Sequence, residues 1–237
     1  MKKALVRVGV LNNFNYSEEE IKVLHIYEKM FPQYDFFVNS NSFITIKSDF
    51  PSIVTINPYL TFVEPKGDLS NIKAVRVKIV VDANDKTYEN ENEAVRWAVN
   101  NNIPVLITWQ RFKSLKTLFT YTDSRESYNN VRSYLRPQKT YRDERFKELQ
   151  YLFENKAGLL FQCDEQGKGC PSCNNCSRLV TGDIYEVYSL NLKASGICLF
   201  HCPDCFAKEV LNLCVSKRPA CDKLIRNRKQ RGGLIHD

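Results

Sequence analysis

Segments rich in valine and isoleucine alternate with helical patterns over the first two thirds of the chain, and this alternation limits the fold more than any other feature. Residues 73–83, KAVRVKIVVDA, are the clearest strand. Residues 90–102 follow with Ala94, Trp97 and Ala98 on one helical face. Apolar strands joined by helices are typical of parallel sheets. The predicted fold class is therefore α/β, as a partial parallel (β/α) barrel or sheet.

The remaining elements follow the same alternation. Besides residues 73–83, we expect strands at residues 4–11, 34–40, 43–47, 52–58, 103–110 and 157–163, and helices at residues 17–31 and 143–156, with a further helix starting at 114. The basic start, MKKALVRVGVL, is interrupted by Arg7 and predicts a first strand, not a signal peptide. No apolar run approaches the ~20 residues of a membrane helix. We therefore expect a cytoplasmic protein with no membrane partner.

All nine cysteines lie after Gln162. Thiols stay reduced in the cytoplasm, so CxxC-type spacing there indicates metal binding before disulfides. The first cluster is Cys163, Cys170, Cys173 and Cys176, on a loop that contains Gly and Pro. Four thiolates can close a tetrahedral Zn²⁺ site. The predicted organisation is an α/β domain at residues 1–160 and a C-terminal cysteine-rich metal-binding module at residues 161–237.

A second cluster, Cys198, Cys202 and Cys205, follows the alternating segment IYEVYSLNLKASG and precedes the helical segment FAKEVLNL. Three cysteines at this spacing can hold three irons of a [4Fe–4S] cluster. The segment YSLNLKASGICLFHCPDCFAKEVL resembles the cluster-binding segment of radical S-adenosylmethionine (SAM) enzymes. The resemblance implies a [4Fe–4S] cluster whose open iron binds SAM. Together with the four-cysteine knot it is similar to phage and mobile-element proteins.

In that family the cysteine motif lies near the start of the chain, on the first barrel strand, whereas here it lies near the end. A circular permutation would reconcile the two orders. The strand before Cys198 would then lie beside and parallel to the strand at residues 4–11, and a helix from Phe206 would connect their layers. The cysteines would lie at the C-terminal mouth of the barrel, close to the expected cofactor-binding residues Asn12, Asn13 and Asn15.

Zinc at both clusters is the alternative. The pairs Cys173/Cys176 and Cys202/Cys205 resemble a treble-clef zinc finger, in which a knuckle, a hairpin and a helix supply two CxxC pairs. A second site would then draw on the remaining candidate ligands: Cys163, Cys170, Cys198, His201, Cys214 and Cys221. This alternative predicts a non-catalytic nucleic-acid-binding or interaction protein, with the strand before Cys198 paired antiparallel in a small hairpin far from residues 4–11.

The net charge of +7 is concentrated in two regions. The segment 121–145 interleaves arginine with tyrosine, and residues 206–237 carry eight Lys or Arg against three acidic residues. Each is explained either by a solvated surface or by contacts with nucleic-acid phosphates. The candidate contacts are Arg132, Arg136, Lys139, Arg142, Arg226, Arg228, Lys229 and Arg231.

Other patterns carry less information. His25 falls within an apolar helical pattern and predicts a packing role. Asp82 and Asp85 follow the strongest strand, where α/β folds place ligands or simply cap a loop. The chain has no phosphate-binding Gly loop, Gly-x-Ser-x-Gly or His-Glu-x-x-His motif. No residue is assigned to catalysis, and enzymatic activity is left open.

Overall fold

The computed structural model describes residues 4–8, 18–30, 32–41, 50–59, 61–131, 134–163, 175–182, 186–192 and 198–200. The expected strand at residues 43–47 lies outside these ranges, as does the expected helix from Phe206. Strands β1 (Ala4–Val8), β2 (Tyr34–Ser40), β3 (Ser52–Ile56), β4 (Ile72–Ile79), β5 (Val105–Trp109), β8 (Leu160–Gln162), β9 (Glu186–Leu192) and β10 (Cys198–Phe200) form one sheet. Strands β6 (Tyr128–Val131) and β7 (Tyr134–Pro137) form a separate antiparallel hairpin.

The main sheet has the strand order β10-β9-β1-β2-β3-β4-β5-β8. All neighbouring pairs from β9 to β8 are parallel, and only β10 is antiparallel to its neighbour. The predicted α/β class with a parallel sheet is therefore confirmed. Strands β1, β2, β3, β4, β5 and β8 lie side by side in chain order, whereas β9, which follows them in the chain, returns to pair with β1. Among the described strands, β8 and β10 are the two edges, so these strands form an open sheet.

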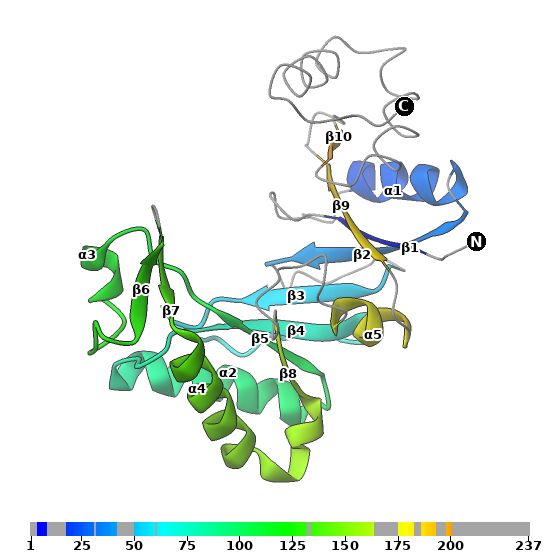
Figure 1. Cartoon of the computed structure of the whole chain (residues 1–237). Coiled ribbons are helices and arrows are strands. Elements are labelled where there is room, and N and C mark those ends of the chain that lie inside the picture. Colours follow the sequence, from blue (N-terminus) through cyan, green and yellow to red (C-terminus); the bar gives the residue numbers. More distant parts are fainter. Residues whose placement is uncertain are drawn as a thin grey trace, which may run out of the picture.

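Helices α1 (Glu18–Met30), α2 (Asp85–Asn100), α3 (Leu115–Leu118), α4 (Lys139–Leu152) and α5 (Asn175–Thr181), with the 3₁₀ segment η1 (Glu154–Leu159), complete the described elements. Figure 1 shows α2 and α4 together on one side of the sheet. Alternate strand residues such as Val75, Val77 and Ile107 form one apolar cluster with Trp97 of α2 and Leu149 of α4. This two-residue period places the larger part of the core between the sheet and α2/α4.

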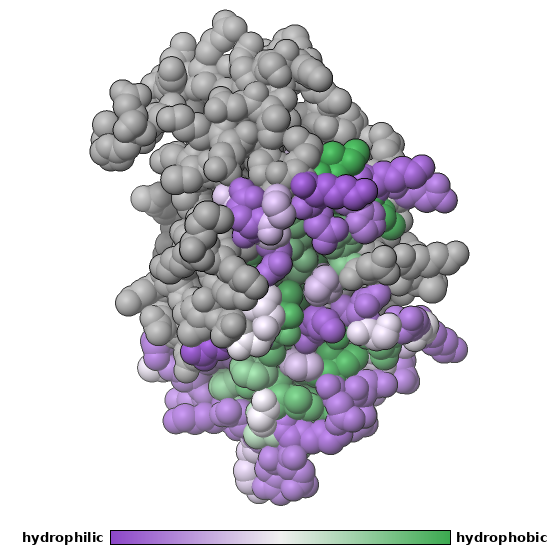
Figure 2. Space-filling view, turned by 90° about the vertical axis from the view of Figure 1, so that its right-hand side faces the viewer, coloured by the Kyte–Doolittle hydropathy of each residue, from purple (hydrophilic) through white to green (hydrophobic). Residues whose placement is uncertain are grey.

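The opposite face of the sheet packs against α5. The intervening strand residues, among them Leu5, Phe37 and Leu106, form a second apolar cluster with Cys176 of α5. Helix α5 follows β8 and precedes β9 in the chain. It packs on the strands that lie between these two in the sheet. Figure 2 shows the end of the molecule at which the parallel strands begin, with hydrophobic residues visible between hydrophilic ones.

Two helices begin earlier than the apolar pattern predicts. Helix α2 begins at Asp85 because the side chain of Asn84 caps it by accepting a hydrogen bond from the Thr87 N–H at 3.0 Å. Helix α4 begins at Lys139. The Arg/Tyr-rich segment before it, interpreted from the sequence as a loop with little periodicity, contains the β6–β7 hairpin.

Strand β9 pairs with β1 in parallel, with Leu5 opposite Val187 and Val8 opposite Leu190. The predicted adjacency of these strands is confirmed. Strand β9 also pairs antiparallel with β10 on its other side, which the permuted arrangement did not anticipate. Parts of the second predicted domain, α5 and β9, therefore pack on or join the sheet of the first. The boundary at residue 160 stays a prediction.

Candidate metal centre and the polar face of the sheet

The two outer cysteines of the first cluster stand at the ends of a closed loop. Cys163 directly follows β8, and its N–H donates to the Ile107 carbonyl at 2.8 Å, which extends the parallel pairing with β5. Cys176 lies in the first turn of α5. The Asn175 side chain just before it donates to the Gln162 carbonyl at 2.8 Å. The chain therefore leaves β8 and returns to it within fourteen residues, as a metal knot requires.

Cys176 is buried against the sheet, with Arg76 beside its sulfur. The Arg76 Nη2 lies 3.5 Å from the Cys176 Sγ, and Nη1 donates to the Asn39 Oδ1 at 2.8 Å. A guanidinium at this distance favours the thiolate, the form of cysteine that binds metal. The donor chemistry of this cysteine thus fits a metal ligand.

Most of the other predicted ligands lie outside the described residues, and these are Cys170, Cys173, Cys202 and Cys205. The candidate cofactor residues Asn12, Asn13 and Asn15 also lie outside them. Within the described ranges no group of three or more metal-binding side chains comes together. Only the backbone of Cys198 is described. It pairs with Leu192, the last residue of β9, at the edge of the sheet where the parallel strands end.

The face of the sheet that packs on α5 changes from apolar to polar along the strands. Arg76 and Lys78 alternate with Val75, Val77 and Ile79 in β4, so both cations lie on this face. Arg7 is also on it, since Leu5 of the same strand packs against α5. Burial, and then the charge of Arg76, lower the pKa of Lys78.

Sequence reasoning missed this row of cations. It identified residues 73–83 as the clearest strand and did not consider Arg76 and Lys78 separately. The signal was present, because two charged residues spaced two apart within a valine-rich strand must share one face.

The Arg/Lys-rich segment is partly internal. Arg142 is buried, Arg136 is half-buried, and exposed Lys139 pairs with Asp143 at 2.6 Å. Arg132 and the predicted contacts of the C-terminal tail, Arg226, Arg228, Lys229 and Arg231, lie outside the described residues. Of the described candidates, Lys139 and Arg136 therefore have the access that a phosphate contact needs.

A buried ion network joins α2 and α4 at the end of β4. Glu91 is completely buried, and its Oε1 accepts the Val80 N–H at 2.6 Å, while Arg145 lies 3.4 Å from its Oε2. Arg145 also pairs with Glu148 at 3.0 Å and stacks over the Tyr88 ring at 4.1 Å. Both carboxylates of this network pair with Arg145, which is typical of a structural clamp, while the buried Arg145 Nε has no hydrogen-bond partner among the described residues.

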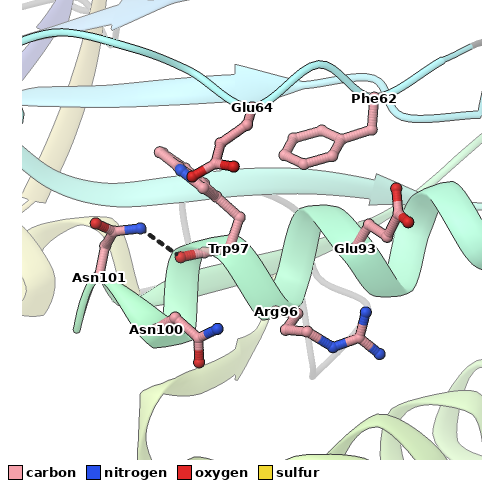
Figure 3. A pocket seen from close by; sticks show the side chains of 7 residues that line it. All are labelled: Phe62, Glu64, Glu93, Arg96, Trp97, Asn100 and Asn101. Carbon is pink, nitrogen blue, oxygen red and sulfur yellow. Dashed lines mark hydrogen bonds between the residues drawn. The ribbon is translucent and has the colours of Figure 1, made fainter.

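Two surface hollows of about 350 Å³ flank α2. One lies beside Asp82, between α2 and α4, and is lined by Glu144 and by members of the ion network. In the other, the side chains of Phe62 and Glu64 point from the loop after β3 toward Trp97 on α2 (Figure 3). The Phe62 and Trp97 rings are 6.4 Å apart, so the loop is packed onto the helix.

His25 lies on α1 with its ring 4.8 Å from Phe50 and its Nδ1 3.3 Å from the Glu28 carboxylate. These contacts agree with the packing role that its sequence position predicts.

Among the described helices, none combines the length and the apolar character needed to span a bilayer. No family model, curated protein or solved structure matches this chain.

Proposed function

We propose that this chain is a metal-cluster-binding protein resembling radical SAM enzymes. It carries a [4Fe–4S] cluster on Cys198, Cys202 and Cys205 and a structural zinc ion on Cys163, Cys170, Cys173 and Cys176. The observation that carries the proposal is the parallel pairing of β9 with β1. It supports a permuted partial barrel in which the strand that precedes the three-cysteine segment is a member of the parallel sheet.

The edge at which this strand ends supports a cofactor site. Parallel strands share one C-terminal edge, where α/β proteins bind their ligands. Leu192 ends β9 there, and Cys198 pairs with it. Asn12, Asn13 and Asn15 follow β1, the neighbouring strand, and are the residues that we propose to contact SAM. Under the resemblance, the chemistry that the cluster supplies is reductive cleavage of that cofactor.

The zinc site is supported by the closed loop between β8 and α5 and by the buried, arginine-flanked Cys176. Zinc at the first cluster would hold α5 against the sheet and so fix the connection from β8 to β9. Its role is structural, because four thiolates leave no open position on the ion.

Metal analysis of protein purified without oxygen tests both assignments. We expect a brown protein with about four iron atoms and one zinc per chain. Replacing Cys198, Cys202 and Cys205 by alanine should remove the iron and leave the zinc. Replacing Cys170 and Cys173 by serine should remove the zinc.

Cys214→Ser is the matched control, since this cysteine belongs to neither proposed site but is a candidate zinc ligand in the alternative. The variant should keep both metals. A colourless protein with two zinc ions, one of them lost in Cys214→Ser, contradicts the iron–sulfur assignment.

The second candidate function is a zinc-binding, treble-clef-like nucleic-acid-binding protein. The antiparallel β9–β10 pairing favours it, because a treble clef contains a hairpin between its two CxxC pairs. The pairing of β9 with β1 does not, because this alternative predicts a hairpin far from residues 4–11. The basic tail would then contact phosphates. Affinity for an oligonucleotide should fall with salt, with a log–log slope of about −0.7 to −0.9 per neutralised phosphate.

Removing residues 223–237 should make that slope shallower, whereas Lys73→Met, a change at an exposed lysine of β4, should leave it unchanged. Absence of binding at low salt would count against this function.

A further inference from the structure

Lys78 is a half-buried ammonium group that has no hydrogen bond or ion pair with the described part of the chain. It lies near the C-terminal end of β4, and its register partner on β5 is Thr108. Partners in a parallel pair project to the same face, so Lys78 and Thr108 are neighbours on the face that packs on α5. The Thr108 Oγ1 is buried, and it too lacks a hydrogen-bond partner among the described residues. Such groups are costly unless something satisfies them.

Two further features surround this pair. Arg76 lies two residues before Lys78 on the same face, and its guanidinium is held by Asn39 and Cys176. Asn57, the residue after β3, has a buried Oδ1 to which no group in the described part of the chain donates. No aspartate or glutamate occurs on this face of β3, β4 or β5. At the C-terminal edge of the sheet, this face therefore combines two positive charges, the Thr108 hydroxyl as a donor and the Asn57 Oδ1 as an acceptor. The three strands supply no carboxylate to it.

We propose that Lys78 and Thr108 form a binding site for the phosphate group of a small molecule. Arg76, two residues before Lys78 on the same face of β4, adds a second positive charge. A phosphate dianion matches two cations better than a carboxylate does, and its several oxygens can accept from the ammonium and the hydroxyl together. In inorganic phosphate the dianion HPO4²⁻ keeps one P–OH, which can donate to the Asn57 Oδ1. The C-terminal edge of a parallel sheet is the usual place for such a ligand.

The lowered pKa of Lys78 agrees with this assignment. Burial and the neighbouring Arg76 charge both disfavour the ammonium, and a bound anion reverses these effects. The site goes beyond the proposed metal-cluster function and does not depend on it, since phosphate binding is measured without any metal chemistry.

The test is calorimetric titration of the whole metal-loaded protein with inorganic phosphate, at an ionic strength held constant with KCl. We expect binding to the wild-type chain. Lys78→Met should weaken it by about tenfold or more, as expected for loss of a charge-assisted hydrogen bond. Thr108→Val should weaken it by about three- to tenfold. Lys73→Met, at an exposed position on the same strand, is the matched control and should bind as the wild type does.

Thermal unfolding without phosphate separates a binding role from a structural one. Neither Lys78 nor Thr108 has a hydrogen-bond partner to lose among the described residues, so both variants should be as stable as the wild type or more stable. No phosphate binding by the wild type overturns the proposal, as does unchanged affinity in Lys78→Met. If Lys78→Met binds phosphate as tightly as the wild type but has lost its metal, these cations serve the thiolate centre instead.

Discussion

At the scale of single residues, Glu91 is the most perturbed carboxyl group of the ion network. Its burial raises its pKa from the ordinary value of 4.5 to about 8, although the Val80 N–H and Arg145 both favour the charged form. The folded chain therefore retains a proton between these pH values that the unfolded chain releases. Linkage then requires that the contribution of Glu91 to the free energy of unfolding falls as pH rises from about 4.5 to about 8.

Glu91→Gln should flatten this decline, because glutamine cannot titrate. The difference in slope between the two proteins should approach, at most, about 1.4 kcal/mol per pH unit. Urea unfolding at several pH values between 5 and 8 measures it. Glu93→Gln, an exposed change on the same helix, serves as the control and should follow the wild-type profile. Parallel profiles for Glu91→Gln and the wild type would show that Glu91 is ionised in the folded protein.

At the scale of elements, the β6–β7 hairpin is fastened to the end of β4 by one side chain. The Tyr128 hydroxyl accepts the Val81 N–H at 3.0 Å and lies 3.2 Å from the Val81 carbonyl. Burial raises the pKa of this hydroxyl above its ordinary value, so it remains a donor throughout the physiological range. The hairpin thereby covers the end of the strand on the side of α4.

Tyr128→Phe should lower the free energy of unfolding by about 1–3 kcal/mol, because it leaves a buried N–H without its acceptor. Chemical denaturation of the variant checks this. Tyr134→Phe, at an exposed position of the same hairpin, should change stability by no more than about 0.5 kcal/mol. Equal effects of the two substitutions would mean that the Tyr128 hydroxyl does not anchor the hairpin.

At the scale of the whole molecule, the two faces of the sheet depend on different parts of the chain. The core between the sheet and α2/α4 is built from residues before 161. On the other face, the described residues that cover the sheet belong to α5, a seven-residue helix that contains the last cysteine of the first cluster. A helix this short is not stable alone, and the zinc ion that we propose for the first cluster would contribute directly to the folding of this part of the chain.

Removal of metal by a strong chelator should therefore expose α5 and β9 to hydrogen exchange while β4, β5 and α2 keep their protection. Hydrogen exchange followed by mass spectrometry, with and without the chelator, resolves these segments. Protein incubated with the zinc-saturated chelator is the control. Equal loss of protection in β4 and β9 would mean that the metal supports the entire fold.

The parallel α/β class and most strands were predictable because they depend on local periodicity. Residues 34–40 and 52–56 form strands within the ranges that the sequence predicts, since apolar runs of this length suit a sheet covered on both sides. Helix starts were less accurate, because Asn84 caps α2 through its own side chain before the apolar pattern begins. The adjacency of β9 and β1 was predicted from a family resemblance and not from periodicity.

The sequence by itself determined which residues can be strands, which face of each strand is apolar, and where thiols gather. Only the tertiary structure decided that β9 lies between β1 and β10, that Arg76 reaches Cys176, and that Lys78 stands beside Thr108. The physical reason is that periodicity records the direction of a side chain from its own backbone. Its partners come from segments that can be a hundred residues away, as for Arg76 and Cys176, and only strand order and register bring them together.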